Sequence, residues 1–429
     1  MQGHALSLDA LFAMLPHIPE AESLRQRIMA ASVPDPALAW TNASAYSTVD
    51  KRVIATVDLK SVLEQAELAS VERVRRFHAT LAEAVNALVQ GDEAAVAERL
   101  ITLGDQAASA ELQGAAAACF ETAVSVAAAR SDPALKALTL RKLARARAAT
   151  GDVATAASLY RASHEQASAA DDHEACITAL LGTGNMLTVQ GRWREAGELY
   201  HIALTHATHA RAQLRGQALI NLSIIARETG DHDGAAAWLE RAEALWSDLT
   251  VGDRSVWYNN LGLLQLARGE YEAAGHAFES ALNHADSDYD RAMICDNVAE
   301  LMLRQRRLDQ AEAAGRRAEA YALSSGSPRA LAEVYVRLGK VFRLRGDANG
   351  VTFFEKALEI CRGRTYTLIE AQAYYEYGLF RRLLGDVDEA RSFVAQAQTR
   401  YRELGSYELA EHAAALLSQL QSEAGPGSP

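Results

Sequence analysis

Ser255 to Asp288 read SVWYNNLGLLQLARGEYEAAGHAFESALNHADSD, and this run predicts two amphipathic helices joined by a tight turn at Gly269-Glu270. Apolar side chains recur at helical spacing, at Tyr258, Leu261, Leu264 and Leu266 and then at Ala274, Phe278, Ala281 and Leu282. Neither helix can bury its apolar face alone, so the hairpin requires similar hairpins on both sides.

The chain supplies those neighbours. From Ala97 onward, eight units follow one another at intervals of 37 to 40 residues. A glycine followed by a polar residue marks the turn of most units, as at Gly230-Asp231 and Gly385-Asp386. We expect the first helices of the units to start at Ala97, Ala137, Ile177, Gly216, Ser255, Ala292, Ala332 and Ala371.

Small and large residues also recur at fixed places in the units. A small residue stands midway along each first helix, at Gly104, Ala144, Gly184, Ser223, Gly262, Ala299, Gly339 and Gly378. Glycine in a helix costs up to about 1 kcal/mol, so we expect the second helix to approach closely there. Large side chains in the second helices are expected to fill the space between the two helices: Phe120, Tyr160, Tyr200, Leu239, Phe278 and Phe354.

These positions resemble the tetratricopeptide repeat (TPR) family, whose pattern is carried here by Leu261-Gly262 and by Ala274, Phe278 and Ala281. The resemblance covers about Ala97 to Leu409. The usual unit has about 34 residues, so these longer units resemble the branch seen in kinesin light chains, spindle-orientation adaptors and the sensor arrays of some bacterial regulators. The resemblance implies an all-α, right-handed solenoid. The chain departs from the family pattern in lacking a closing proline and in having Arg306-Arg307 at one turn.

Other segments flank the eight repeats, which are predicted at residues 97–409. Residues 1–57 predict short helices and an irregular segment, and residues 58–96 predict a long helix that leads into the array. Residues 410–422 predict a helix that covers the exposed end of the last repeat. Residues 423–429 predict a disordered tail.

The composition describes a folded chain, with 49% hydrophobic residues, 23% charged residues and 8 prolines. There are 43 Lys and Arg against 55 Asp and Glu, and the net charge of −12 argues against general nucleic-acid binding. No signal peptide and no run of membrane-spanning length is evident, so we expect a cytoplasmic protein without a membrane partner. The four cysteines lack ligand spacing and are expected to be buried thiols.

Asparagines repeat on the face that is expected to line the concave groove. Two residues before the small residue, consecutive units carry Asn221, Asn260 and Asn297. A carboxamide donates and accepts hydrogen bonds, so such a row can hold the main chain of an extended peptide. The resemblance to long-repeat relatives implies this role for the three asparagines, and we expect Asn185 and Asn259 to contribute. The alternative is that these amides are consensus positions that face solvent.

Basic residues form two expected patches along the same groove. Lys142 and Arg145 lie toward one end, and Arg337, Lys340 and Arg343 lie further along, with Arg227 between the patches. Such patches can hold acidic side chains or a C-terminal carboxylate of a partner. The alternative is that these helix faces are charged only because they are solvated.

Motifs for nucleotide, nucleophile or metal chemistry are absent from the sequence, so we expect no enzyme, no cofactor and no metal. The predicted function is a non-catalytic scaffold that binds an extended peptide segment of a protein partner in its concave groove. The alternatives are a ligand-responsive or peptide-responsive regulatory TPR protein and a structural subunit of a larger assembly. Homo-oligomerisation and occupation of the groove by residues 34–57 stay open.

Overall fold

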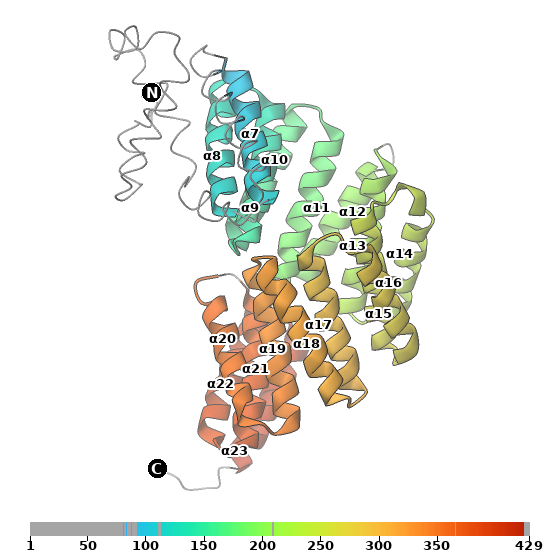
Figure 1. Cartoon of the computed structure of the whole chain (residues 1–429), viewed down its shortest axis with the longest axis vertical. Helices are drawn as coiled ribbons and strands as arrows, with labels where there is room; N and C mark the ends of the chain where they lie inside the picture. The colour runs from blue at the N-terminus through green and yellow to red at the C-terminus, as the bar shows by residue number, and fades with distance from the viewer. Residues whose placement is uncertain are drawn as a thin grey trace, which may run out of the picture. The chain divides into compact units, whose positions relative to one another are not determined.

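The computed structural model describes residues 92–109, 113–207, 210–364 and 366–423, together with Thr80, Glu83 and Ala87. These residues form α-helices and short 3₁₀ turns and contain no strand (Figure 1). The structure is therefore all-α, as the sequence predicts. The helices are α7 (Glu93–Ser109), α8 (Gln113–Ala129), α9 (Pro133–Ala149), α10 (Val153–Ala169), α11 (His173–Val189), α12 (Trp193–His206), α13 (Ala212–Glu228), α14 (His232–Glu243), α15 (Val251–Ala267), α16 (Tyr271–His284), α17 (Asp288–Arg304), α18 (Leu308–Ser324), α19 (Pro328–Arg345), α20 (Val351–Cys361), α21 (Thr367–Leu383), α22 (Val387–Glu403) and α23 (Tyr407–Glu423).

Two compact units divide the chain. The first unit includes α7, α8, most of α9 and residues 159–175. Its core packs Leu100 and Leu103 of α7 against Phe120 of α8 and Leu143 of α9. The second unit includes residues 148–158 and all described residues from Cys176 onward.

Each first helix starts four residues before the position that the sequence predicts, because a polar turn precedes the apolar pattern. The start of α15 shows such a polar turn. The Thr250 side chain accepts from the Asp253 backbone N–H, and the Asp253 side chain accepts from the Thr250 backbone N–H, which together form a capping box. Ser287 caps α17 and Ser327 caps α19 in a related way, each accepting from the amide three residues later.

Glycine brings the two helices of a hairpin together. A Cβ atom added at Gly262 would lie 2.7 Å from Phe278 Cε1, and one added at Gly339 would lie 2.6 Å from Phe354 Cζ. Phe278 and Phe354 are both fully buried. The sequence therefore predicts correctly which small residue each of these aromatic rings covers.

The turns between helices need left-handed backbone, which explains the recurring glycine. Gly269 has φ 78° and Gly385 has φ 90°. Arg306 replaces glycine in the α17–α18 turn and adopts φ 62°, a conformation that is costly for a residue with a Cβ atom.

Two second helices are shorter than the others. α14 has 12 residues and is followed by a 3₁₀ turn at Trp246–Asp248. α20 has 11 residues and is preceded by a 3₁₀ turn at Ala348–Gly350. The Trp246 ring contacts Trp257 and Tyr258 edge-on, and these contacts fill the space beside the shortened α14.

In the second unit, successive hairpins stack side by side into a solenoid, with α23 packed against α22 (Figure 1). Ala413, Leu416 and Leu420 of α23 are buried against Val394 and Tyr401 of α22. Residues distant in sequence also meet in this unit, since Val153 packs with Cys361, Tyr366 and Ile369.

The predictions for residues 1–57, for most of residues 58–91 and for the tail after Glu423 lie outside the described residues. All four cysteines are buried, as the sequence predicts. None of the helices in the described part of the chain has the length and apolar character needed to cross a membrane.

Candidate peptide-binding groove

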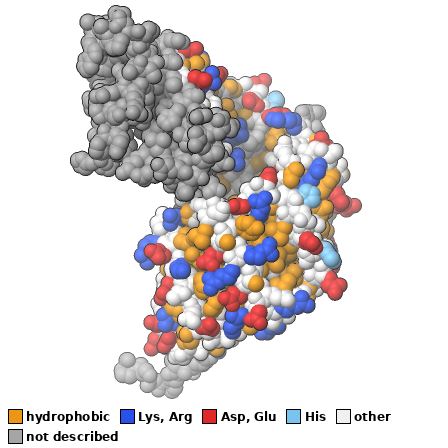
Figure 2. Space-filling model, viewed as in Figure 1, with side chains coloured by type: hydrophobic (Ala, Val, Ile, Leu, Met, Phe, Trp, Pro, Cys, Tyr) orange, Lys and Arg blue, Asp and Glu red, His pale blue; other side chains and the backbone are white. Residues whose placement is uncertain are grey.

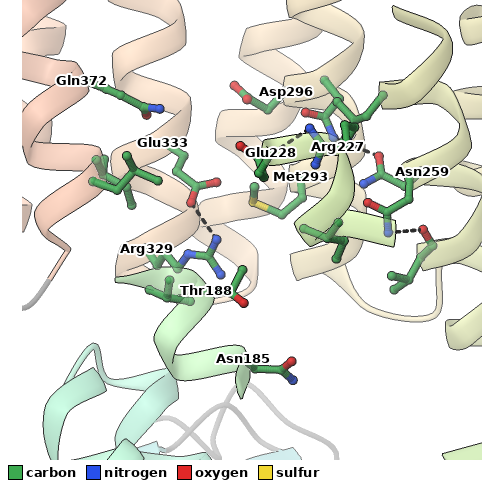
Figure 3. Close-up of a pocket in the computed structure, with 18 of the residues that line it drawn as sticks. Asn185, Thr188, Arg227, Glu228, Asn259, Met293, Asp296, Arg329, Glu333 and Gln372 are labelled. Atoms are coloured by element: carbon green, nitrogen blue, oxygen red, sulfur yellow. Dashed lines mark hydrogen bonds and ion pairs between the residues drawn. The ribbon is translucent and has the colours of Figure 1, made fainter. Parts of the chain in front are cut away.

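A cavity of about 800 Å³ lies within the second unit. Its wall consists mainly of the first helices of successive hairpins, namely α11, α13, α15, α17, α19 and α21. Figure 3 shows side chains from these six helices around it. Ligand pockets typically measure about 300–1,000 Å³, so this cavity, called the groove below, is the candidate functional site.

Asn185 and Asn221 form one amide pair in the wall. Asn221 Nδ2 donates to Asn185 Oδ1 at 3.1 Å, and Tyr200 OH donates to the same oxygen at 2.7 Å. Tyr200 is buried, which raises the pKa of its hydroxyl and keeps the group neutral. Because its oxygen is occupied, Asn185 offers its NH₂ group to a ligand, and Asn221 offers its oxygen.

Asn259 and Asn297 form a second amide pair with the same polarity. Asn297 Nδ2 donates to Asn259 Oδ1 at 2.9 Å. Asn259 therefore offers its NH₂ group, and Asn297 offers its oxygen. In both pairs the later repeat donates to the earlier one, so the NH₂ group offered to a ligand comes from the earlier repeat and the oxygen offered comes from the later one.

Asn260 does not join these pairs. Its side chain is 4% exposed, and its Nδ2 donates to Val256 O of its own helix at 2.9 Å. The structure therefore brings together Asn185 with Asn221 and Asn259 with Asn297, while Asn260, which also lines the groove, bonds within its own helix. A one-residue step turns a side chain by about 100° around a helix, which separates the positions of Asn259 and Asn260.

Arg337 and Lys340 of α19 bind carboxylates of α17. Arg337 Nη2 lies 3.0 Å from Asp296 Oδ2, Arg337 Nη1 also pairs with Glu300, and Lys340 Nζ lies 2.9 Å from Glu300 Oε2. Burial would raise the pKa of Glu300, but Arg337 and Lys340 outweigh it and lower that pKa to about 2. Burial raises the pKa of Asp296, and Arg337 opposes this shift. These ion pairs link two successive repeats.

Arg329, which the sequence analysis did not select, forms another paired group in the wall. Arg329 Nη2 lies 3.0 Å from Glu333 Oε1, and Arg329 Nη1 donates to Tyr289 OH at 2.9 Å. The dashed line in Figure 3 marks the ion pair between Arg329 and Glu333. Burial raises the pKa of Glu333, and the Arg329 charge opposes the shift.

Arg343 and Arg227 are also paired. Arg343 Nη2 lies 2.8 Å from Glu376 Oε2 and links α19 to α21, although Arg343 itself stands outside the groove wall. Arg227 Nη1 lies 2.7 Å from Glu228 Oε1 on the same helix, and both residues line the groove. In the second unit, Arg227, Arg337, Lys340 and Arg343 thus already have carboxylate partners.

Lys142 and Arg145 belong to the first unit and are described there. Lys142 Nζ lies 2.6 Å from Asp105 Oδ1, which links α9 to α7. Arg145 is exposed. Burial lowers the pKa of the neighbouring Arg141, which lies beside Tyr160 and Arg145.

Apolar side chains and further polar groups complete the wall. Several of these residues share a helix face with a predicted site residue, one turn before or after it. Arg329, Glu333, Arg337 and Lys340 show this spacing of three or four residues along α19. A step of one turn from a predicted position identifies Thr188, Val189, Ile224, Val256, Leu263, Met293 and Val336, whereas no predicted position lies one turn from Met186, Tyr289, Leu368, Gln372 or Tyr375.

Basic, acidic and hydrophobic side chains are interspersed on the face of the second unit seen in Figure 2. No cluster of three or more His, Cys, Asp or Glu residues with a metal-binding arrangement occurs among the described residues.

Comparisons with known proteins give structural neighbours. No family model matches the sequence. No curated protein matches it either. A Rap protein complexed with Competence and Sporulation Factor matches with a TM-score of 0.51 at 15% identity, over 85% of this chain and 98% of that one. The chain has the tetratricopeptide-repeat fold.

Two further solved structures are similar to the chain. The Rap conjugation gene regulator of plasmid pLS20, solved with the Phr* peptide, has a TM-score of 0.51 at 16% identity, over 73% of this chain and 90% of that one. A tetratricopeptide repeat protein from Parabacteroides merdae has a TM-score of 0.42 at 17% identity, over 66% of this chain and 98% of that one. At these identities the likeness concerns the fold.

Proposed function

We propose that this TPR-fold protein is a non-catalytic scaffold that binds an extended peptide segment of a protein partner in the groove of its second unit. The observation that carries the proposal is the pair of polarised amide couples, Asn185–Asn221 and Asn259–Asn297. Each couple offers one donor and one acceptor. An extended main chain presents N–H and C=O groups along the same edge, so each couple can satisfy one of each.

The surroundings of the couples support this role. Ile224 lies one turn from Asn221, and Leu263 lies one turn from Asn259, so apolar side chains stand beside both couples. The Tyr200 hydroxyl holds Asn185 in place, which limits the ordering cost that binding would otherwise carry. The pLS20 regulator, of the same fold, was solved with a peptide, which offers a precedent for such a ligand.

A retention experiment tests the proposal. The full chain is immobilised and exposed to a pool of N-acetylated, C-amidated random heptapeptides, and the retained amount is measured by mass spectrometry. We expect Asn259→Ala with Asn297→Ala to reduce retention at least tenfold, because each peptide hydrogen bond contributes about 0.5–1.5 kcal/mol. Asn283→Ala, an exposed asparagine of α16 outside the groove, should leave retention unchanged.

The buried Asn260 supplies a further comparison. Asn260→Ala removes a hydrogen bond within α15 and should lower the thermal midpoint while the variant still retains peptides. Retention by the Asn259→Ala, Asn297→Ala variant equal to that of the wild type would contradict main-chain binding by these amides.

A further inference from the structure

We propose that the peptide bound in the groove is recognised through apolar side chains and carries no charged anchor. This inference rests on the proposed function and specifies the chemical class of its ligand. It departs from the sequence-based expectation that Arg337, Lys340 and Arg343 hold acidic groups of a partner.

The half of the groove built by α11, α13 and α15 is apolar between its amides. Met186, Val189, Ile224, Val256 and Leu263 line it. Among the described residues that line this half, the charged ones are Arg227 and Glu228, which pair with each other. A peptide side chain placed here meets hydrocarbon, so an apolar side chain is favoured and a charge would lose hydration without compensation.

The half built by α17, α19 and α21 is charged but internally paired. A ligand carboxylate that bound Arg337 would have to displace Asp296 or Glu300. Asp296 is 3% exposed, so the displaced carboxylate would stay buried without its partner. A ligand cation that bound Asp296 or Glu300 would have to displace Arg337, which would then be buried without a carboxylate partner. Breaking a buried ion pair in this way is strongly unfavourable.

The overall charge of the groove agrees with this view. Four basic and five acidic side chains line it, so a ligand finds no substantial charge surplus to complement. Among the described residues that line the groove, Asp290 is the acidic residue without an ion pair, and it takes part in the cap of α17, where its Oδ2 accepts from Ser287 Oγ at 2.5 Å. Burial raises the pKa of Asp290, which favours its neutral form.

Met293 and Val336 extend the apolar surface into the charged half. Methionine side chains are flexible and adapt to different apolar partners. The ligand class that fits both halves is therefore a peptide of near-zero net charge with several Leu, Ile, Val, Met or Phe side chains.

The composition of the retained heptapeptides tests this inference. The pool is blocked at both ends, so any charge comes from side chains. Mass-spectrometric sequencing of peptides retained by the wild-type chain should show Leu, Ile, Val, Met and Phe enriched at least threefold over the input. Asp, Glu, Lys and Arg should be depleted by a similar factor.

A charge-introducing variant sharpens the test. Ile224→Lys places a cation in the apolar half, and its retained pool should gain Asp and Glu at least threefold. Ile202→Lys is the matched control, because Ile202 is 45% exposed on α12 and lies outside the groove. Its retained pool should match that of the wild type. If Ile224→Lys fails to fold by circular dichroism, Leu263→Lys replaces it, and the wild-type composition already decides the question.

The outcomes separate the two proposals. Wild-type enrichment in Asp and Glu would show that the groove arginines accept ligand carboxylates, and enrichment in Lys and Arg would identify Asp290 as an anchor. Either result overturns this inference while leaving peptide binding intact. Retention of no peptide above a blank column overturns the proposed function and this inference with it.

Discussion

The close contact between Gly262 and Phe278 determines the spacing of a helix pair. A Cβ atom at Gly262 would lie 2.7 Å from Phe278 Cε1, whereas the nearest atom to a Cβ at Gly275 of the next helix is Leu301 Cδ2, 3.8 Å away. Both glycines are helical, so both gain the same intrinsic helix propensity on mutation to alanine. The atoms around each glycine therefore decide whether its substitution by alanine stabilises or destabilises the protein.

We predict opposite effects on stability for these two substitutions. Gly262→Ala should destabilise the second unit by about 1–3 kcal/mol because Phe278 must move. Gly275→Ala should stabilise it by about 0.4–1 kcal/mol, since a compatible site gains by restricting the unfolded chain. Urea unfolding followed by circular dichroism measures both. Equal effects of the two variants would show that the Gly262 contact does not limit packing.

Glu300 gives the second unit a pH dependence. The pKa of its carboxyl falls from the ordinary 4.5 to about 2. A lowered pKa means that folding stabilises the ionised carboxylate more than the protonated carboxyl group. The resulting stability is fully present above pH 4.5 and is lost as the pH falls toward 2. The shift corresponds to about 3 kcal/mol at most. Asp296 acts in the opposite direction, because its pKa is raised.

The contribution of Glu300 is measured as a difference between two proteins. We expect the wild type to lose more stability than Glu300→Gln as the pH falls from 5 to about 2.5, in urea unfolding at each pH. At pH 7 the variant should be the less stable, because Arg337 and Lys340 lose a partner. Parallel pH profiles for the two proteins would contradict the assignment.

The sequence predicts the stretches of helix that line the groove, but not which of two neighbouring side chains forms the contacts between repeats. The repeat spacing predicts that Asn221, Asn259, Asn260 and Asn297 lie on the groove face, and all four line the groove. It does not predict that Asn259 pairs with Asn297 while Asn260 bonds to Val256 O, because one residue turns the side chain by about 100° around the helix. The ion pairs were also unpredicted, since Arg337 and Asp296 are 41 residues apart and meet only when their helices pack.

The helices and their turns are the level at which the sequence is most informative. Periodic apolar residues and turn glycines predict the eight hairpins from α7 to α22, because each depends on contacts within about 40 residues. The predicted start of each first helix is four residues too late, because the residues of the capping turn are polar. The 3₁₀ turns after α14 and before α20 are not predicted, since they depend on how Trp246 and Phe353 pack.

The α17–α18 turn permits a test of the rule for turn glycines. Arg306 has φ 62° where Gly269 has φ 78° in the preceding unit, and no atom lies within 4 Å of a Cβ at Gly269. We expect Arg306→Gly to stabilise the second unit by about 0.5–1 kcal/mol, and Gly269→Arg to destabilise it by about 1–2 kcal/mol. Thermal and urea unfolding measure both changes. A loss of stability in Arg306→Gly would mean that the arginine side chain contributes more than its backbone costs.

At the level of the whole molecule, the sequence predicts a solenoid but not its division. The eight units are alike in pattern, so nothing in their spacing separates residues 148–158 from the rest of α9 and α10. Those residues join the second unit because Val153 packs with Tyr366, more than 200 positions away. Such a contact depends on small rotations accumulated over many repeats, which single-repeat patterns do not specify.

The groove is likewise a property of several repeats together. Its wall draws on six first helices, and its two amide couples come from α11, α13, α15 and α17. The central claim is that these couples hold the main chain of a peptide. Side-chain preferences alone would not establish this, because an apolar pocket also selects side chains.

Main-chain methylation tests the claim most directly. The heptapeptide most strongly retained by the wild type is prepared with single N-methyl groups at each position, and its affinities are measured by isothermal titration calorimetry. Methylation removes one N–H donor and leaves the side chain. We predict that at least one position loses fivefold or more in affinity, which corresponds to about 1 kcal/mol for a lost hydrogen bond. That loss should vanish in Asn259→Ala with Asn297→Ala or in Asn185→Ala with Asn221→Ala. Equal affinity of all methylated peptides for the wild type would contradict main-chain recognition.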